Sequence, residues 1–194
     1  MTSPWEPFSI PIIADEDRRD TYAGVGRALS EWEGIEVGLC RIFSFFVGDP
    51  DGAAMRTYGE PRIFRDRFQA LLRVANKFFI SSPDQELEGT IDQLETEISG
   101  YADRRNEIAH GIVMPINAYS FAKQVFSQAK PRTNYYVLLP SYYQVRNHRP
   151  DGMPEFIYGA NALHKIADNL STIYPKLVDY REELRLALWR REQP

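Results

Sequence analysis

The sequence predicts an all-α fold, an up-down bundle of about four long helices with a small β-hairpin inserted before the last one. Four segments place apolar residues at alternating spacings of three and four, which is the period of one helix face. The composition, with 43% hydrophobic and 26% charged residues over 194 residues, is typical of one globular domain. We therefore expect a single helical domain over residues 21–194. Residues 1–20 contain three prolines and no helical period, so they are expected to form an extended arm.

The first two helices are delimited by capping and breaking residues. A helix is expected to begin at Asp20 or Thr21, because both residue types accept hydrogen bonds from the free N–H groups of a first turn, and to end at Gly48. The second helix is expected to begin at Pro61, since proline is favoured in the first turn, and to run to about Ile80.

The third and last helices carry the longest apolar stripes. The third is expected to follow the capping residue Asp84 and to continue to Ile112. The last is expected over residues 160–190. Its stripe continues past Pro175, so the proline is expected to bend this helix without ending it.

Residues 114–158 break the helical pattern and are expected to form an insertion. Five prolines punctuate this stretch, and short β-type segments lie at 135–139, 142–146 and 155–158. The insertion is too short for a hydrophobic core of its own. It therefore predicts a small β-hairpin belonging to the helical domain.

Charge limits the functions open to the chain. A net charge of −4 and a pI near 5.5 argue against a protein that coats nucleic acid or anionic membranes through bulk charge, so such binding requires a local patch. Residues 56–77 carry a net +4 and residues 84–107 a net −6, and two helices of this kind can complement each other at the surface. The loop 146–149, flanked by Tyr142 and Tyr143, has two readings: phosphate contacts with base stacking, or a solvated hairpin tip.

The single cysteine and the apolar runs bear on the compartment. Cys40 can form no internal disulfide and supplies no cysteine-based zinc site. The nearby apolar run 42–47 is far too short to span a bilayer, and the acidic N-terminal segment lacks the basic start of a secretory signal. We expect a cytoplasmic protein with no membrane contact, no metal and no cofactor.

Two charged residues fall on apolar stripes. Arg105 lies at the centre of the third helix's stripe, and Glu36 lies inside the stripe of the first helix. An isolated buried charge is very costly, so each side chain must be paired or must reach a cleft. The long side chain of Arg105 has a further alternative, which is to extend from the end of the bundle into solvent. One hypothesis is an ion pair between Glu36 and Arg105 across the bundle, and the other is a catalytic role for the carboxylate.

Polar groups also gather near the end of the third helix. Asn106 and His110 are four residues apart and share one helix face, adjacent to Arg105, and Gly111 is a residue type that ends helices. The segment thus combines a permanent cation, an amide and an imidazole.

This segment resembles the signature of the HEPN superfamily: an Arg, then a polar residue, three further residues and a His. Arg105, Asn106 and His110 stand at the three defining positions. The resemblance covers about residues 21–113 and 159–190 and implies a bundle of about four helices. It also implies a metal-independent endoribonuclease or RNA-binding protein, in stress or phage defence, whose product ends in a 2′,3′-cyclic phosphate.

The resemblance also implies a role for each motif residue. His110 would transfer a proton at the 2′-hydroxyl or at the leaving 5′-oxygen. Arg105 would stabilise the charge of the phosphorane-like transition state, and Asn106 would position the phosphate or its partner side chain. Intramolecular attack by a 2′-hydroxyl needs a near-neutral acid–base group and a cation held by geometry, without a metal.

The partners follow from the same resemblance. Active members act as dimers, so a homodimer is expected, with RNA or a nucleotide as ligand. Gly34 and Gly38, four residues apart, indicate a close helix crossing or part of a dimer interface. Ile112 stands where toxins paired with nucleotidyltransferase antitoxins usually have Tyr, so that pairing is not expected and a protein partner stays open. The alternative is a catalytically silent interaction or nucleotide-sensing module, with Glu36 in support of Arg105.

Overall fold

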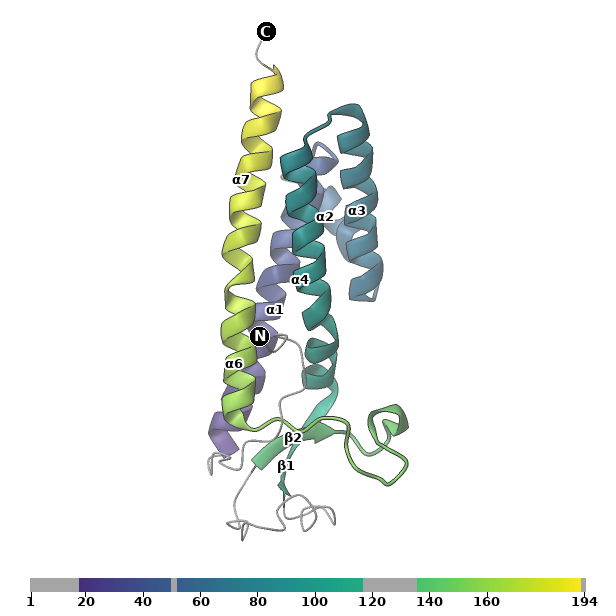
Figure 1. Cartoon of the computed structure of the whole chain (residues 1–194), viewed down its shortest axis with the longest axis vertical. Helices are drawn as coiled ribbons and strands as arrows, with labels where there is room; N and C mark the ends of the chain where they lie inside the picture. The colour runs from purple at the N-terminus through teal and green to yellow at the C-terminus, as the bar shows by residue number, and fades with distance from the viewer. Residues whose placement is uncertain (1–17, 50–51, 117–135, 193–194) are drawn as a thin grey trace. The chain divides into compact units, whose positions relative to one another are not determined.

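The computed structural model describes residues 18–49, 52–116 and 136–192, and within them the chain is mostly helical with one small two-stranded antiparallel sheet (Figure 1). The coarse prediction of a helical protein with a small β element is therefore confirmed. Residues 1–17 of the expected arm and residues 117–135 of the expected insertion lie outside the described residues. No helix in the described part of the chain has the length and apolarity to cross a membrane.

The described residues divide into two compact units. The first unit consists of the described residues up to Glu31 together with Asp103–Leu170, and the second of Trp32–Ala102 together with the described residues from Ser171 onward. Helix α1 (Arg18–Phe46) and helix α4 (Gln85–His110) contribute residues to both units.

The helix boundaries agree with the local signals in the sequence. Helix α1 begins two residues before the predicted Asp20, and α4 begins directly after Asp84. The carboxylate of Asp84 accepts a hydrogen bond from the backbone N–H of Leu87 at 3.2 Å, which is the expected N-terminal cap. Asp84 thus supplies the partner that a first-turn N–H group otherwise lacks.

The second unit consists of helices that pack through aromatic side chains and, at one crossing, through a glycine. It contains three whole helices, α2 (Ala54–Gly59), α3 (Phe64–Ser81) and α7 (Ile173–Glu192). It also contains the later part of α1 and the earlier part of α4. Phe46 of α1 packs edge-on against Phe78 and Phe79 of α3. A Cβ added at Gly38 would lie 2.8 Å from Leu177 Cδ1, so this glycine permits a close crossing of α1 and α7. The close helix crossing predicted for the glycine pair is thus confirmed at Gly38.

The first unit places the sheet at the end of α4. Strand β1 (Gly111–Pro115) follows α4 without an intervening loop and pairs with β2 (Tyr136–Pro140), with Gly111 opposite Pro140 (Figure 1). A Cβ at Gly111 would lie 2.8 Å from the side chain of Leu138 and 2.9 Å from the carbonyl oxygen of Glu107. The helix therefore turns into the strand at a position where only glycine fits without displacement. Helix α6 (Ala160–Ser171) belongs to this unit up to Leu170.

The strand predictions were right in one place and wrong in another. The segment 135–139 corresponds to β2, but its partner is β1, whose first two residues were predicted to end the third helix. Residues 142–146 form no strand and instead lead into a 3₁₀ helix, η2 (Val145–Asn147). Of the predicted 155–158 strand, Tyr158 forms a single antiparallel bridge with Leu138. The apolar run after Gly111 satisfies its backbone by pairing with a distant segment, which a local pattern does not reveal.

The prediction of one continuous last helix over residues 160–190 is also wrong. It is interrupted at Thr172, so that α6 ends at Ser171 and α7 begins at Ile173. Pro175 has no N–H to donate to the carbonyl of Ser171, four residues earlier, and its ring crowds that carbonyl. The apolar stripe on both sides predicted a bend, but the missing hydrogen bond ends one helix and a new one starts.

Candidate active site

The motif residues occupy the last two turns of α4, in the first unit. Asn106 and His110 are exposed, and Arg105 is half-buried. The guanidinium Nη1 of Arg105 donates a hydrogen bond to Oδ1 of Asn106 at 3.3 Å. His110 is the last helical residue, and its carbonyl oxygen accepts a hydrogen bond from Oγ of Ser141 at 3.0 Å. An amide and an imidazole are thus exposed along one short stretch of the helix, with a half-buried guanidinium beside them.

Arg104, which the sequence analysis did not single out, anchors this helix end. Its Nη1 donates to the hydroxyl of Tyr158 at 2.8 Å and forms an ion pair with Glu107 at 2.9 Å, while the Tyr158 hydroxyl donates to Glu107. Burial raises the pKa of Glu107 and, more strongly, that of Tyr158. The signal available beforehand was the opposite charge of Arg104 and Glu107 at a spacing of three.

This buried group fixes the motif relative to the sheet of the same unit. Tyr158 pairs through its backbone with Leu138 of β2, with hydrogen bonds of 2.8 and 3.0 Å in the two directions. Its hydroxyl meanwhile contacts Arg104 and Glu107 on α4. The side chains that flank the motif on the helix are therefore held, which restricts the motion of the exposed groups beside them.

Glu36 does not pair with Arg105, contrary to the hypothesis drawn from the sequence. It lies in the second unit and is 8% exposed, and its carboxylate is held by both Nε and Nη2 of Arg67 from α3, with Nε to Oε2 at 3.0 Å. The hydroxyl of Tyr58 and the indole N–H of Trp32 also donate to it, each at 3.3 Å. The partner is the arginine that packing brings opposite the carboxylate, and helical periodicity on one helix cannot identify it.

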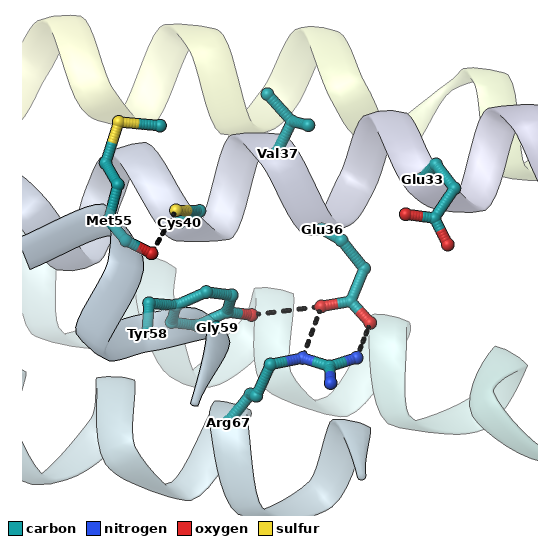
Figure 2. A pocket seen from close by; sticks show the side chains of 8 residues that line it. All are labelled: Glu33, Glu36, Val37, Cys40, Met55, Tyr58, Gly59 and Arg67. Carbon is teal, nitrogen blue, oxygen red and sulfur yellow. Dashed lines mark hydrogen bonds and ion pairs between the residues drawn. The ribbon is translucent and has the colours of Figure 1, made fainter. Parts of the chain in front are cut away.

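A cavity of about 400 Å³ opens beside this ion pair (Figure 2). Its walls come from α1, α2 and α3 of the second unit, and its lining residues are Glu33, Glu36, Val37, Cys40, Met55, Tyr58, Gly59 and Arg67. Figure 2 shows the Glu36 carboxylate directed at the Arg67 guanidinium, with the Tyr58 hydroxyl beside them. Arg67 also donates from Nη1 to the carbonyls of Pro61 and Arg62, at 3.0 and 3.2 Å.

These contacts favour a structural role for the charges in the cavity. Each carboxylate oxygen of Glu36 accepts two hydrogen bonds, and Arg67 uses Nε, Nη1 and Nη2 as donors. A pair satisfied in this way joins α1 and α3 and has little capacity left for a substrate. We therefore place the candidate chemistry at the motif of α4 and not in this cavity.

Cys40, which also lines the cavity, is not suited to catalysis either. Its thiol lies at the cavity and donates a weak hydrogen bond to the carbonyl of Met55 at 3.5 Å. Burial, and then the negative charge of Glu36, raise the pKa of the thiol above its ordinary value. The thiolate is the nucleophilic form, so this cysteine is a poor nucleophile.

A labelling experiment checks this environment. At pH 8 the folded chain should react with an aromatic disulfide reagent severalfold more slowly than the same chain in urea, because the raised pKa lowers the thiolate fraction and burial limits access. The rate should rise with pH. Equal rates in the folded and unfolded chain would contradict a half-buried, unactivated thiol.

The surface charges do not pair as the sequence suggested. The exposed cations of α3 and its flank, Arg62, Arg65, Arg73 and Lys77, form no ion pair within the described residues. The acidic helix α4 instead contributes Glu97 to an ion pair with Lys176 of α7 at 2.7 Å. The two oppositely charged segments therefore do not complement each other through direct ion pairs in the described chain.

The remaining histidines have separate partners. Nε2 of His164 lies 2.8 Å from the carboxylate of Asp20, and Nδ1 of His148 lies 3.0 Å from the carbonyl of Gln144. Among the described residues, no three side chains of His, Cys, Asp or Glu are grouped so that they could hold a metal ion.

Comparison with known proteins adds no relative: no family model, no curated protein and no solved structure matches the chain.

Proposed function

We propose that this chain is a HEPN-type RNA-cleaving protein that acts without a metal through Arg105, Asn106 and His110. The observation that carries the proposal is the exposure of two motif residues: Asn106 and His110 are exposed on α4, and the half-buried Arg105 donates a hydrogen bond to Asn106. The helical character of the chain also supports an assignment to this superfamily, whose members are helical bundles.

The proposed reaction is an intramolecular transfer. The 2′-oxygen of a ribose forms a bond to the adjacent phosphorus, and the bond from phosphorus to the 5′-oxygen breaks. One proton leaves the 2′-hydroxyl and one reaches the departing 5′-oxygen, and an imidazole can perform either transfer. The products are a 2′,3′-cyclic phosphate and a 5′-hydroxyl.

Each motif residue has one task in this scheme. His110, at the exposed end of the helix, carries the proton. Arg105 binds two phosphate oxygens with its planar guanidinium and stabilises the added negative charge. Asn106, already hydrogen-bonded to Arg105, orients that guanidinium or contacts the phosphate. A homodimer would bring two such motifs together and supply both an acid and a base, and sedimentation at micromolar concentration tests that assembly.

The alternative function is a catalytically silent interaction or nucleotide-sensing module. Its structural premise was the Glu36–Arg105 ion pair, and Glu36 is occupied by Arg67 instead. That form of the pair is therefore wrong, and the RNA experiment below decides between the silent module and the ribonuclease.

The test is incubation of the purified chain with mixed single-stranded RNAs in EDTA. We expect cleavage, with fragments that end in a 2′,3′-cyclic phosphate and begin with a 5′-hydroxyl. An otherwise identical RNA with every 2′-hydroxyl methylated should stay intact, because the nucleophile is blocked. A requirement for a divalent metal, or products with 3′-hydroxyl ends, would contradict the proposed chemistry. Intact RNA under all conditions would favour the silent module.

A further inference from the structure

The segment that follows β2 exposes an unusual amount of apolar surface. Tyr142, Tyr143 and Val145 are 81%, 78% and 79% exposed. Single exposed apolar side chains are common on protein surfaces, whereas clustered ones are typical of contact sites. We call residues 141–149 the aromatic loop.

Hydrogen bonds hold the aromatic loop in its shape. The backbone N–H of Gln144 donates to the carbonyl of Ser141 at 2.9 Å, and that of Asn147 donates to the carbonyl of Gln144 at 2.9 Å. The side chain of Asn147 donates to that of Gln144 at 2.9 Å. His148 forms an antiparallel bridge with Pro154. The exposed rings therefore stand on a backbone that is already ordered, which lowers the entropy cost of binding to them.

The aromatic loop begins beside the motif, within the first unit. Pro140 of β2 pairs with Gly111, which follows His110 directly, and Oγ of Ser141 donates to the carbonyl of His110. Consecutive Cα atoms lie about 3.8 Å apart, so the two tyrosines follow within two residues of this contact. The loop therefore emerges at the end of the helix that carries the candidate chemistry.

The charge of the loop suits a polyanion. Residues 141–149 contain two arginines, Arg146 and Arg149, and no acidic residue. Arg146 is exposed, while Arg149 lies 3.9 Å from Glu155 in a long, exposed ion pair. The ring of His148 lies 6.1 Å from that of Tyr142. Aromatic rings interleaved with cations are the arrangement that binds single-stranded nucleic acid, through stacking on bases and contacts with phosphates.

We propose that the aromatic loop is a platform on which Tyr142 and Tyr143 stack on bases of single-stranded RNA next to the phosphate held by the motif. The inference rests on the proposed function for its choice of RNA, and it adds the surface that contacts the bases. A second copy of the chain is the less suitable occupant, because a two-fold contact through this loop would bring its arginines toward each other.

The experiment measures binding in the absence of cleavage. The probe is a fluorescein-labelled, fully 2′-O-methylated twelve-nucleotide RNA, read by anisotropy in EDTA. Y142A/Y143A should weaken binding by about fivefold or more for each ring removed, from the typical energy of base–aromatic stacking. Y142F/Y143F should bind within about twofold of the wild type because phenylalanine keeps the stacking face. W189A, which removes an exposed tryptophan from α7, is the control and should bind like the wild type.

An abasic probe separates stacking from other causes. On a strand of the same length and charge that lacks its bases, the wild type and Y142A/Y143A should bind equally, since no base is present to stack. A loss of the same size on both probes would overturn the inference, as would no detectable binding of the methylated RNA. Conversion of a dimer into a monomer by Y142A/Y143A with unchanged RNA affinity would overturn it in favour of a contact between copies.

The readout distinguishes this inference from the proposed function. Tyrosine-dependent, base-dependent binding without cleavage of ordinary RNA supports the platform and contradicts the ribonuclease. Cleavage of ordinary RNA, with Y142A/Y143A binding like W189A, supports the ribonuclease and overturns the platform.

Discussion

Replacement of His110 by alanine should lower the rate of RNA cleavage by about 10²- to 10⁴-fold, the usual contribution of a positioned acid–base group. The side chain is exposed at the final residue of α4, so its removal should change the free energy of unfolding by no more than about 0.5 kcal/mol. Single-turnover cleavage of a labelled RNA in EDTA measures the rate, and urea denaturation measures the stability.

Companion variants make this result specific. Arg105→Lys should also be severely impaired, because a compact ammonium cannot hold two phosphate oxygens in the plane of a guanidinium. His164→Gln, which changes a histidine bound to Asp20 in the same unit, is the control and should cleave like the wild type. Wild-type cleavage by His110→Ala would exclude the proposed acid–base role.

Breaking the Glu36–Arg67 ion pair should lower the free energy of unfolding more than breaking an exposed ion pair such as Glu97–Lys176. Either Glu36→Gln or Arg67→Met alone should lower the free energy of unfolding by about 3–5 kcal/mol, because the remaining partner stays in a largely buried site without its counter-charge. The two side chains are 9% and 17% exposed, and both carboxylate oxygens lose a donor when Arg67 is removed. Urea denaturation of the single and double variants measures the effect.

The double variant and a surface pair provide the comparison. Glu36→Gln with Arg67→Met should be less destabilised than the sum of the two single changes, since no lone charge remains. Glu97→Gln breaks the exposed contact with Lys176 and should cost no more than about 1 kcal/mol. Equal stability of Glu36→Gln and the wild type would show that the pair contributes little.

The sequence predicted those parts of the fold that depend on neighbouring residues. The carboxylate of Asp84 caps α4, and the apolar periods locate α1, α3 and α4 to within a few residues. These features follow from hydrogen bonds and spacings inside one segment, which a single sequence displays.

The features that escaped prediction depend on distant segments. Strand β1 exists because β2, which begins at Tyr136, pairs with it, and Arg67 meets Glu36 across 31 positions of the sequence. Arg104 and Arg105 are neighbours in the sequence, and it is Arg104 that donates a hydrogen bond to the hydroxyl of Tyr158. The helical period places Arg105 at the centre of the apolar stripe. It does not show which of two neighbouring arginines contacts a distant residue, because that contact depends on the packing of other segments.

The junction between α4 and β1 has a consequence for how the chain tolerates length changes. A helix advances by roughly 100° per residue and a strand by 180°, and here the two periods meet at the single bond between His110 and Gly111. One residue inserted at this bond would turn the imidazole away from its present direction or reverse the two faces of β1. Insertions after Pro115 leave that phase unchanged. In any protein built on this plan, the step from histidine to glycine should be fixed in length, while the connection between the two strands is free to vary.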